Sequence, residues 1–223
     1  MRRLLAASAA VLFGSAVLLA APATAASYTP LDGTGLQQTV LRAQMPKILG
    51  SWRQNLYFTM PNEAPVVCWN AKGEPITLPK AATSGGVGYE VDANRTGGVM
   101  IFQYKDQASA DAALAALKGT VCPDNAKIGE DGPASAVPAS QGSDFADASR
   151  DSLISSITST QQGVVVTTET QTTQRGLAVI QTKVTVGASK AGSKWVGRGS
   201  KTNRTWHQRV LAAYDAFGTG GSR

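Results

Sequence analysis

The sequence predicts an α+β fold in which helices pack on an antiparallel β-sheet and one disulfide bond clamps the domain. Short turns at residues 94–97 and 174–176 join consecutive strand patterns, and they leave no room for the crossover helix that parallel strands need. Amphipathic helical patterns flank these strands. Two cysteines, Cys68 and Cys122, remain in the exported part of the chain, and such a pair most simply forms one disulfide.

The beginning of the chain predicts export. Two arginines follow the initiating methionine, residues 4–21 are apolar, and Ala-Thr-Ala at residues 23–25 matches a cleavage signal. We therefore expect a secretory signal peptide over residues 1–25 and a single secreted domain over residues 26–223. No later apolar stretch reaches the length of a spanning helix, so the mature chain is not expected to be an integral membrane protein.

Local patterns predict the N-terminal elements. Apolar residues spaced four and three apart predict a helix over residues 35–45, which ends before a proline. Alternating apolar side chains predict a strand over residues 55–60. Residues 61–80 contain four prolines and are expected to be a loop that carries a short strand at residues 66–69. A second short strand is expected over residues 87–93.

Residues 97–122 form the unit around which the chain is organised. Residues 99–104 are apolar except for Gln103, which predicts a strand buried on both faces. Asp106 then stands where the N-cap of a helix is expected. The buried face of this helix is predicted to contain Ala110, Ala113, Leu114, Leu117 and Val121.

The next segment is rich in proline, glycine and acidic residues. Residues 123–143 are expected to be a long loop. Six acids lie in or beside it, within residues 124–151, but they lack the DxDxDG spacing of a calcium loop. We interpret this segment as a solvated acidic loop, and its sequence does not decide whether it forms a site.

The C-terminal part predicts three strands, a loop and a helix. The strands are expected over residues 152–158, 163–173 and 177–186, and the threonines and glutamines of the middle one predict a sheet with one wet face. Residues 188–204 are rich in glycine and serine and are expected to be a loop. The final helix, residues 205–217, is predicted to bury Trp206, Val210, Ala213, Tyr214 and Phe217 and to end at Gly218.

The formal net charge of the whole chain is +6, and the positive charge is concentrated near the C-terminus. From Gln161 onward, the chain contains nine lysines and arginines but only two acids, Glu169 and Asp215. Such a field favours anionic envelope polymers or acidic ligands, whereas the cations are not interleaved with the aromatics that nucleic-acid binding would favour. Candidate contacts for an anionic ligand are the loop residues Lys190, Lys194, Trp195, Arg198, Lys201 and Arg204.

The sequence contains no recognisable catalytic or cofactor motif. His207 is the only histidine and is interpreted as a satisfied histidine on the surface of the last helix. No G-x-S-x-G, Walker A or GxGxxG segment occurs, and two cysteines with one histidine are too few for a zinc site. We therefore expect no cofactor and no metal, although two carboxylates that meet in a cleft would permit hydrolysis.

The order of these elements resembles a known family. An apolar strand, an alanine-rich helix and a terminal cysteine within residues 100–122 are similar to the PknH-like extracellular sensor domains of actinobacteria, relatives of the Mog1/PsbP-like lipoproteins. The Arg175-Gly176 turn with its following strand, and the helix over residues 206–217, extend the resemblance. Domains of that family often have a second disulfide, for which this chain lacks the cysteines. The resemblance implies an antiparallel sheet with packed helices, a cleft, and ligand sensing.

These observations together favour a secreted ligand-binding or sensor-like module of the cell envelope without catalytic activity. Its partner would be a small ligand or an anionic envelope polymer. Two alternatives remain: a subunit or inhibitor that binds another envelope protein, and a hydrolase with an unrecognised site. A mixed apolar and polar cleft would support the first hypothesis, a flat exposed aromatic patch the second, and two carboxylates in one groove the third.

Overall fold

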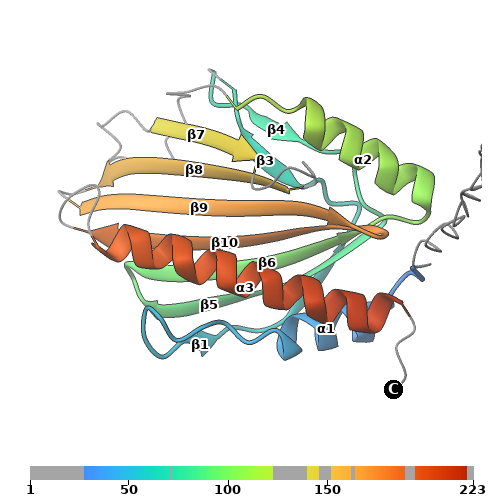
Figure 1. Cartoon of the computed structure of the whole chain (residues 1–223), viewed down its shortest axis with the longest axis horizontal. Helices are drawn as coiled ribbons and strands as arrows, with labels where there is room; N and C mark the ends of the chain where they lie inside the picture. The colour runs from blue at the N-terminus through green and yellow to red at the C-terminus, as the bar shows by residue number, and fades with distance from the viewer. Residues whose placement is uncertain are drawn as a thin grey trace, which may run out of the picture.

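The computed structural model describes residues 28–70, 72–122, 140–145, 152–161, 164–188 and 194–219; the proposed signal peptide lies outside these ranges. Most described strands belong to one antiparallel sheet in the order β1-β5-β6-β10-β9-β8-β7, with β2 also paired to β5 (Figure 1). Its strands are β1 (Arg53–Gln54), β2 (Phe58–Pro61), β5 (Thr83–Asp92), β6 (Arg95–Gln103), β7 (Ser140–Phe145), β8 (Ser152–Gln161), β9 (Val164–Arg175) and β10 (Ala178–Ala188). The antiparallel pairing confirms the predicted fold class.

Three helices and a small hairpin pack against this sheet. The helices are α1 (Gly33–Arg42), α2 (Gln107–Gly119) and α3 (Lys194–Gly218), and the hairpin consists of β3 (Val66–Trp69) and β4 (Pro75–Thr77). Asp106 caps α2 as predicted, because its side chain accepts a hydrogen bond from the backbone N–H of Ser109 at 2.8 Å.

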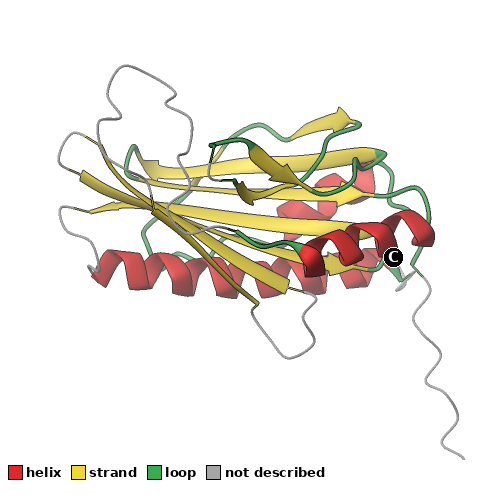
Figure 2. Cartoon of the chain, turned by 90° about the horizontal axis from the view of Figure 1, so that it is seen from above, coloured by secondary structure: helices red, strands yellow, loops and turns green. Residues whose placement is uncertain are grey.

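The first core lies between the sheet and helices α1 and α3. Helix α3 runs lengthwise along one side of the strands (Figures 1 and 2). Leu36 and Val40 of α1 and Trp206 and Val210 of α3 are fully buried there, together with Ile180 of β10. The buried stripe of the last helix is therefore confirmed for its main residues.

The second core lies on the opposite face, beneath α2 and the β3–β4 hairpin. It contains Ala110, Ala113 and Leu117 of α2, which are fully buried. The predicted disulfide is present between Cys68 of β3 and Cys122, with a Cα–Cα distance of 5.9 Å. It joins the hairpin to the residues that follow α2, and so it fixes the layer that covers this face.

The second half of strand β6, from Val99 onward, packs against both cores, as its sequence predicted. Val99 and Ile101 belong to the core beneath α3, whereas Phe102 belongs to the core beneath α2. Gln103 is also buried, and its side-chain amide exchanges two hydrogen bonds with the backbone of Leu31, at 2.9 and 2.7 Å. Gln103 therefore anchors the N-terminal segment to the end of β6.

A polar cluster closes the end of the sheet near the β9–β10 turn. Gly176 adopts a left-handed backbone conformation there, with φ of +54°, which glycine accommodates without steric cost. Tyr28 donates a hydrogen bond to Asp215, which also accepts two from Arg175. Burial alone would raise the pKa of Asp215, but the hydrogen bonds from Arg175 and Tyr28 outweigh it and hold the pKa below its usual range.

Several local predictions are wrong at their edges. Val121 is 79% exposed and does not belong to the buried face of α2. Of the strand expected over residues 55–60, only residues 58–60 are in a strand, β2, and residues 55–57 connect it to β1, which pairs with a different part of β5. The turn expected at residues 94–97 lies at residues 93–94, so residues 95–97 belong to β6.

Parts of the segments expected to be loops form strands. The prediction that one face of β9 is exposed to solvent is also wrong. Strand β4 lies within the proline-rich segment, and β7 begins at Ser140, before the predicted end of the acidic loop. In β9, Gln171, Thr172 and Thr173 are all buried. Both faces of this strand are covered at that point, one by α3 and the other by the β3–β4 hairpin, because Thr173 contacts His207 while Thr172 contacts Gln181.

The largest correction concerns the basic segment at residues 188–204. Helix α3 begins at Lys194, so most of the expected loop is helical. Gly199 accounts for the misleading composition: a Cβ atom there would lie 2.8 Å from Cγ2 of Val186 in β10. The glycine lets the helix approach the sheet closely, and close approach is a use of glycine that resembles a loop signal in sequence.

Candidate functional site

A groove of about 610 Å³ lies on the face of the sheet opposite α3. Its floor is formed by β5, β6, β10 and β9, and the segment that leads into the β3–β4 hairpin forms a wall. The position follows from strand alternation in β10: Thr182 contacts His207 of α3, so Lys183 points to the other face, where Gln181 donates to the backbone oxygen of Val66 in β3.

The middle of the floor has few side chains because two neighbouring strands, β5 and β6, place glycines there. Gly88 of β5 pairs with Gly98 of β6, and Gly98 pairs in turn with Lys183 of β10. A Cβ atom at Gly98 would have no heavy atom nearer than 3.9 Å, which shows that the space above it is open. Gly98 and Gly88 therefore form a track across two strand spacings, about 10 Å, from Lys183 to β5, where the Asn55 side chain borders the track at 3.1 Å from the position of a Cβ atom on Gly88.

The outer end of this track is apolar. Phe58 of β2 and Met100 of β6 line the groove, and Trp69 of β3 forms part of the opposite wall. A second hollow shares Asn55, Phe58 and Gly88 and continues the groove to the sheet edge, where Leu56 is 89% exposed. Phe58 is 41% exposed, so two large apolar side chains border the opening with part of their surface in solvent.

The charged groups of the groove are unevenly distributed. Lys183 is exposed and forms no ion pair with another described residue. Glu90 also lines the groove, but Arg53 is bonded to it. Glu63 lies more than about 20 Å from Glu90, because its backbone oxygen accepts from Ala81 at the start of β5 while Glu90 is near the end of that strand.

The predicted anionic contacts do not belong to this groove. Lys194, Trp195, Arg198, Lys201 and Arg204 all lie in α3, on the other side of the sheet. Lys190 and most of the acidic segment at residues 124–151 lie outside the described residues. The structure brings four of the predicted cations onto one helix but does not place them around a common loop.

His207 is buried, so its expected surface position is wrong, although its ring is satisfied. Its two ring nitrogens contact the hydroxyl oxygens of Thr173 at 2.7 Å and Thr182 at 2.9 Å. Burial lowers the pKa of His207 to about 3, so the ring is neutral and one nitrogen donates while the other accepts. The Ser152 hydroxyl continues the chain through Thr173. Each of these four residues is buried beneath α3, where no substrate reaches the ring.

Within the described part of the chain, no three His, Cys, Asp or Glu residues are grouped so that they could hold a metal ion. The same part contains no helix that is both long enough and apolar enough to cross a membrane.

Sequence reasoning missed the groove because its lining comes from six strands and the segments between them. Lys183 resembles any polar residue of a strand, and Phe58 was interpreted as part of a regular strand face. One signal was available: glycines recur at residues 85, 86, 88, 97 and 98, within or directly before the two strands predicted over residues 87–93 and 99–104. Glycine within a strand often marks a close approach of another chain or ligand.

No protein-family model matches the chain, and no curated protein matches it significantly. The function must therefore be argued from the geometry of the site.

Proposed function

We propose that the chain is a secreted, non-catalytic ligand-binding module of the cell envelope, and that the glycine-floored groove is its binding site. The groove carries the proposal, since it is a concave site of about 610 Å³ with apolar walls and few charged groups. Ligand sites in proteins commonly have this size and this mixture of side chains. The signal-peptide pattern and the resemblance to PknH-like sensor domains support export and sensing.

The arrangement of the groove favours an amphiphile with one anionic group. An anionic head would pair with Lys183 at the inner end of the track, where the flanking Gly98 has no side chain to hinder it. An apolar body would then cross Gly88 toward Phe58 and Leu56 at the sheet edge. Burial of those side chains by the ligand would contribute about 25 cal/mol for each Å² of apolar surface removed from water.

The geometry gives less support to the two alternatives. Among the described large apolar residues that are exposed, Leu56 and Phe58 border the hollow, while Leu41 and Val121 lie on α1 and after α2, so the four do not form one flat patch for another protein. The carboxylates of Glu63 and Glu90 lie at opposite ends of β5, too far apart for the pair of acids that glycoside hydrolysis uses.

Binding of two probes with opposite heads tests the proposal. Dodecanoate and dodecyltrimethylammonium, both below their micelle concentrations, would be titrated into the mature protein by calorimetry. We expect the wild type to bind dodecanoate more tightly than dodecyltrimethylammonium. Lys183→Glu should lower the affinity for dodecanoate about tenfold or more and raise the affinity for the cationic probe. Lys201→Glu, which makes the same charge change on α3, is the matched control and should leave both affinities within about twofold.

Two results would overturn the proposal. One is that neither amphiphile binds, and the other is that Lys183→Glu and Lys201→Glu change the two affinities equally. The first would show that the groove does not accept an apolar body, and the second that net charge alone governs binding.

A further inference from the structure

Helix α3 presents a continuous basic face to solvent. Lys194, Arg198 and Lys201 follow one another at spacings of four and three residues, which places them on one side of the helix. Arg204 and Arg209 are also exposed and continue the cationic surface for about 22 Å from Lys194. We call these five residues the α3 ridge.

No acid of helix α3 lies between the ridge residues, and Glu169 of β9, which accepts from Ser200 and Asn203 of the helix, is buried. The only acid of α3 is Asp215, near its end, and Arg175 and Tyr28 already bond it. Lys194, Lys201, Arg204 and Arg209 form no ion pair with any other described residue. The opposite side of the molecule differs, because α2 and the β3–β4 hairpin carry both signs of charge.

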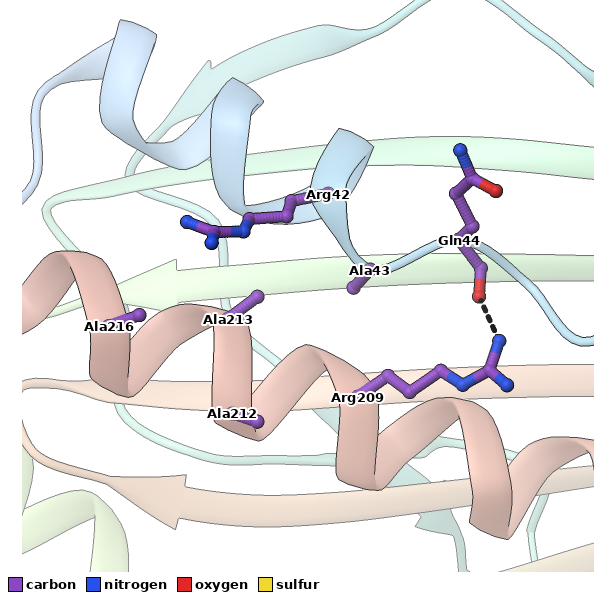
Figure 3. Close-up of a pocket in the computed structure, with 7 residues that line it drawn as sticks. All are labelled: Arg42, Ala43, Gln44, Arg209, Ala212, Ala213 and Ala216. Carbon is purple, nitrogen blue, oxygen red and sulfur yellow. Dashed lines mark hydrogen bonds between the residues drawn. The ribbon is translucent and has the colours of Figure 1, made fainter. Parts of the chain in front are cut away.

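Helix α1 extends the same charged surface. It contains no acid, and Arg42 at its end and Lys47 beyond it are both exposed. A hollow of about 520 Å³ separates Arg42 from Arg209, and its floor consists of alanines, including Ala212 and Ala216 of α3 (Figure 3). Because alanine side chains are small, the hollow has room for a charged group of a ligand between the two arginines.

The two arginines of this hollow are held apart by the protein. Arg42 lies over the ring of Phe217, 5.5 Å from its centroid, and Arg209 donates to the backbone oxygen of Gln44 at 3.1 Å. Their side chains project in different directions from the hollow (Figure 3). They do not form a clamp for a single small anion, whereas a chain with repeated anionic groups could contact one after the other.

We propose that the α3 ridge and the hollow beside α1 bind a linear polyanion. Among the positions between Lys194 and Arg209 whose side chains the structure describes, the exposed ones that are not cationic carry Gly197 and Gln208, which offer no large apolar side chain to a lipid bilayer. Contact is therefore electrostatic, and an extended polymer can follow the line of cations along its whole length. This surface lies on the other side of the sheet from the groove, so the two bindings are separable.

Immobilised linear polyphosphate, probed by interferometry with the mature protein, tests this assignment. The ridge variant replaces Lys194, Arg198, Lys201 and Arg204 by Gln. The matched control replaces Lys72, Lys80, Lys105 and Lys118 by Gln, which removes the same charge from residues outside α1 and α3. Circular dichroism and urea midpoints would show that both proteins are folded.

We expect the ridge variant to lose about 100-fold or more in affinity, since each cation near an anionic surface contributes about fivefold. The magnitude of the slope of log affinity against log salt concentration should fall by about 3, because the variant lacks four cations and so releases fewer counterions on binding. The control should change affinity only a few-fold. Adding Ala212→Glu to the wild type should weaken binding by placing a carboxylate in the hollow.

The proposal is overturned if the ridge variant and the control lose affinity equally, because net charge would then suffice. It is overturned in favour of a membrane if vesicles of phosphatidylglycerol bind the wild type as tightly as polyphosphate and depend on the ridge to the same extent. Loss of amphiphile binding in the groove has no bearing on either result, and so the two proposals fail separately.

Discussion

Two adjacent glycines of β6 provide the sharpest test of the groove. Gly97 and Gly98 both lie in the strand, but they point to opposite faces of the sheet. A Cβ atom at Gly97 would lie 2.4 Å from Cε of Met45 in the core beneath α1 and α3. At Gly98 the nearest heavy atom would be the backbone oxygen of Val87, at 3.9 Å. The same substitution should therefore have opposite effects at the two positions.

We expect Gly98→Val to stabilise the protein slightly and to abolish ligand binding. Glycine in a strand costs about 0.5–1 kcal/mol relative to alanine, and valine is favoured in strands, so the free energy of unfolding should rise by about that amount. The new side chain would stand nearly perpendicular to the sheet, between Lys183 and Gly88, and would block the track.

Gly97→Val should instead lower the free energy of unfolding by about 1–3 kcal/mol, because overpacking displaces Met45. Urea unfolding followed by tryptophan fluorescence measures both changes, and titration with dodecanoate measures the site. If Gly98→Val binds dodecanoate as the wild type does, or if it is destabilised as much as Gly97→Val, then the groove has been assigned to the wrong face.

Two further predictions concern stability. The pKa of His207 is about 3 in the folded protein and near 6.5 in the unfolded chain. Between these two pH values the unfolded chain binds one more proton than the folded protein. The free energy of unfolding therefore falls as the pH decreases through that window, by about 1.4 kcal/mol per pH unit. His207→Gln should flatten this acid dependence in urea titrations at pH 4 to 6.5, and an unchanged slope would contradict the burial of the ring beneath α3. Replacing Cys68 and Cys122 by Ser should cost about 4 kcal/mol, because the bond closes a separation of 54 residues. A loss below about 1 kcal/mol in the same urea assay would contradict that stabilising role.

Local signals were sufficient for the elements that depend on neighbours in the chain. Asp106 was recognisable as an N-cap because its side chain bonds a backbone N–H only three residues away. The strand from Val66 to Trp69 and the disulfide of Cys68 followed from a short apolar run and from cysteine parity. The antiparallel sheet followed from the length of its turns.

Features that depend on distant contacts were not predictable in this way. In the basic segment, the lack of a side chain at Gly199 matters only because β10 lies against it, and the sequence does not show that contact. The threonines of β9 indicated a wet face, yet Thr173 is buried because His207 and Ser152 satisfy its hydroxyl group. Polar residues can be buried when they find such partners, and those partners are 21 and 34 residues away in sequence.

The site and the core use alternate residues of the same strands, and this limits how the protein can vary. In β10, Thr182 and Val184 pack beneath α3 while Lys183 faces the groove. A shift of one residue in the pairing would exchange the two sets and bury the lysine. The register that forms the core therefore also positions the floor of the groove. Phe58, a residue of the wall, lies outside both buried cores, so we expect that its replacement changes the preferred ligand more than it changes the fold.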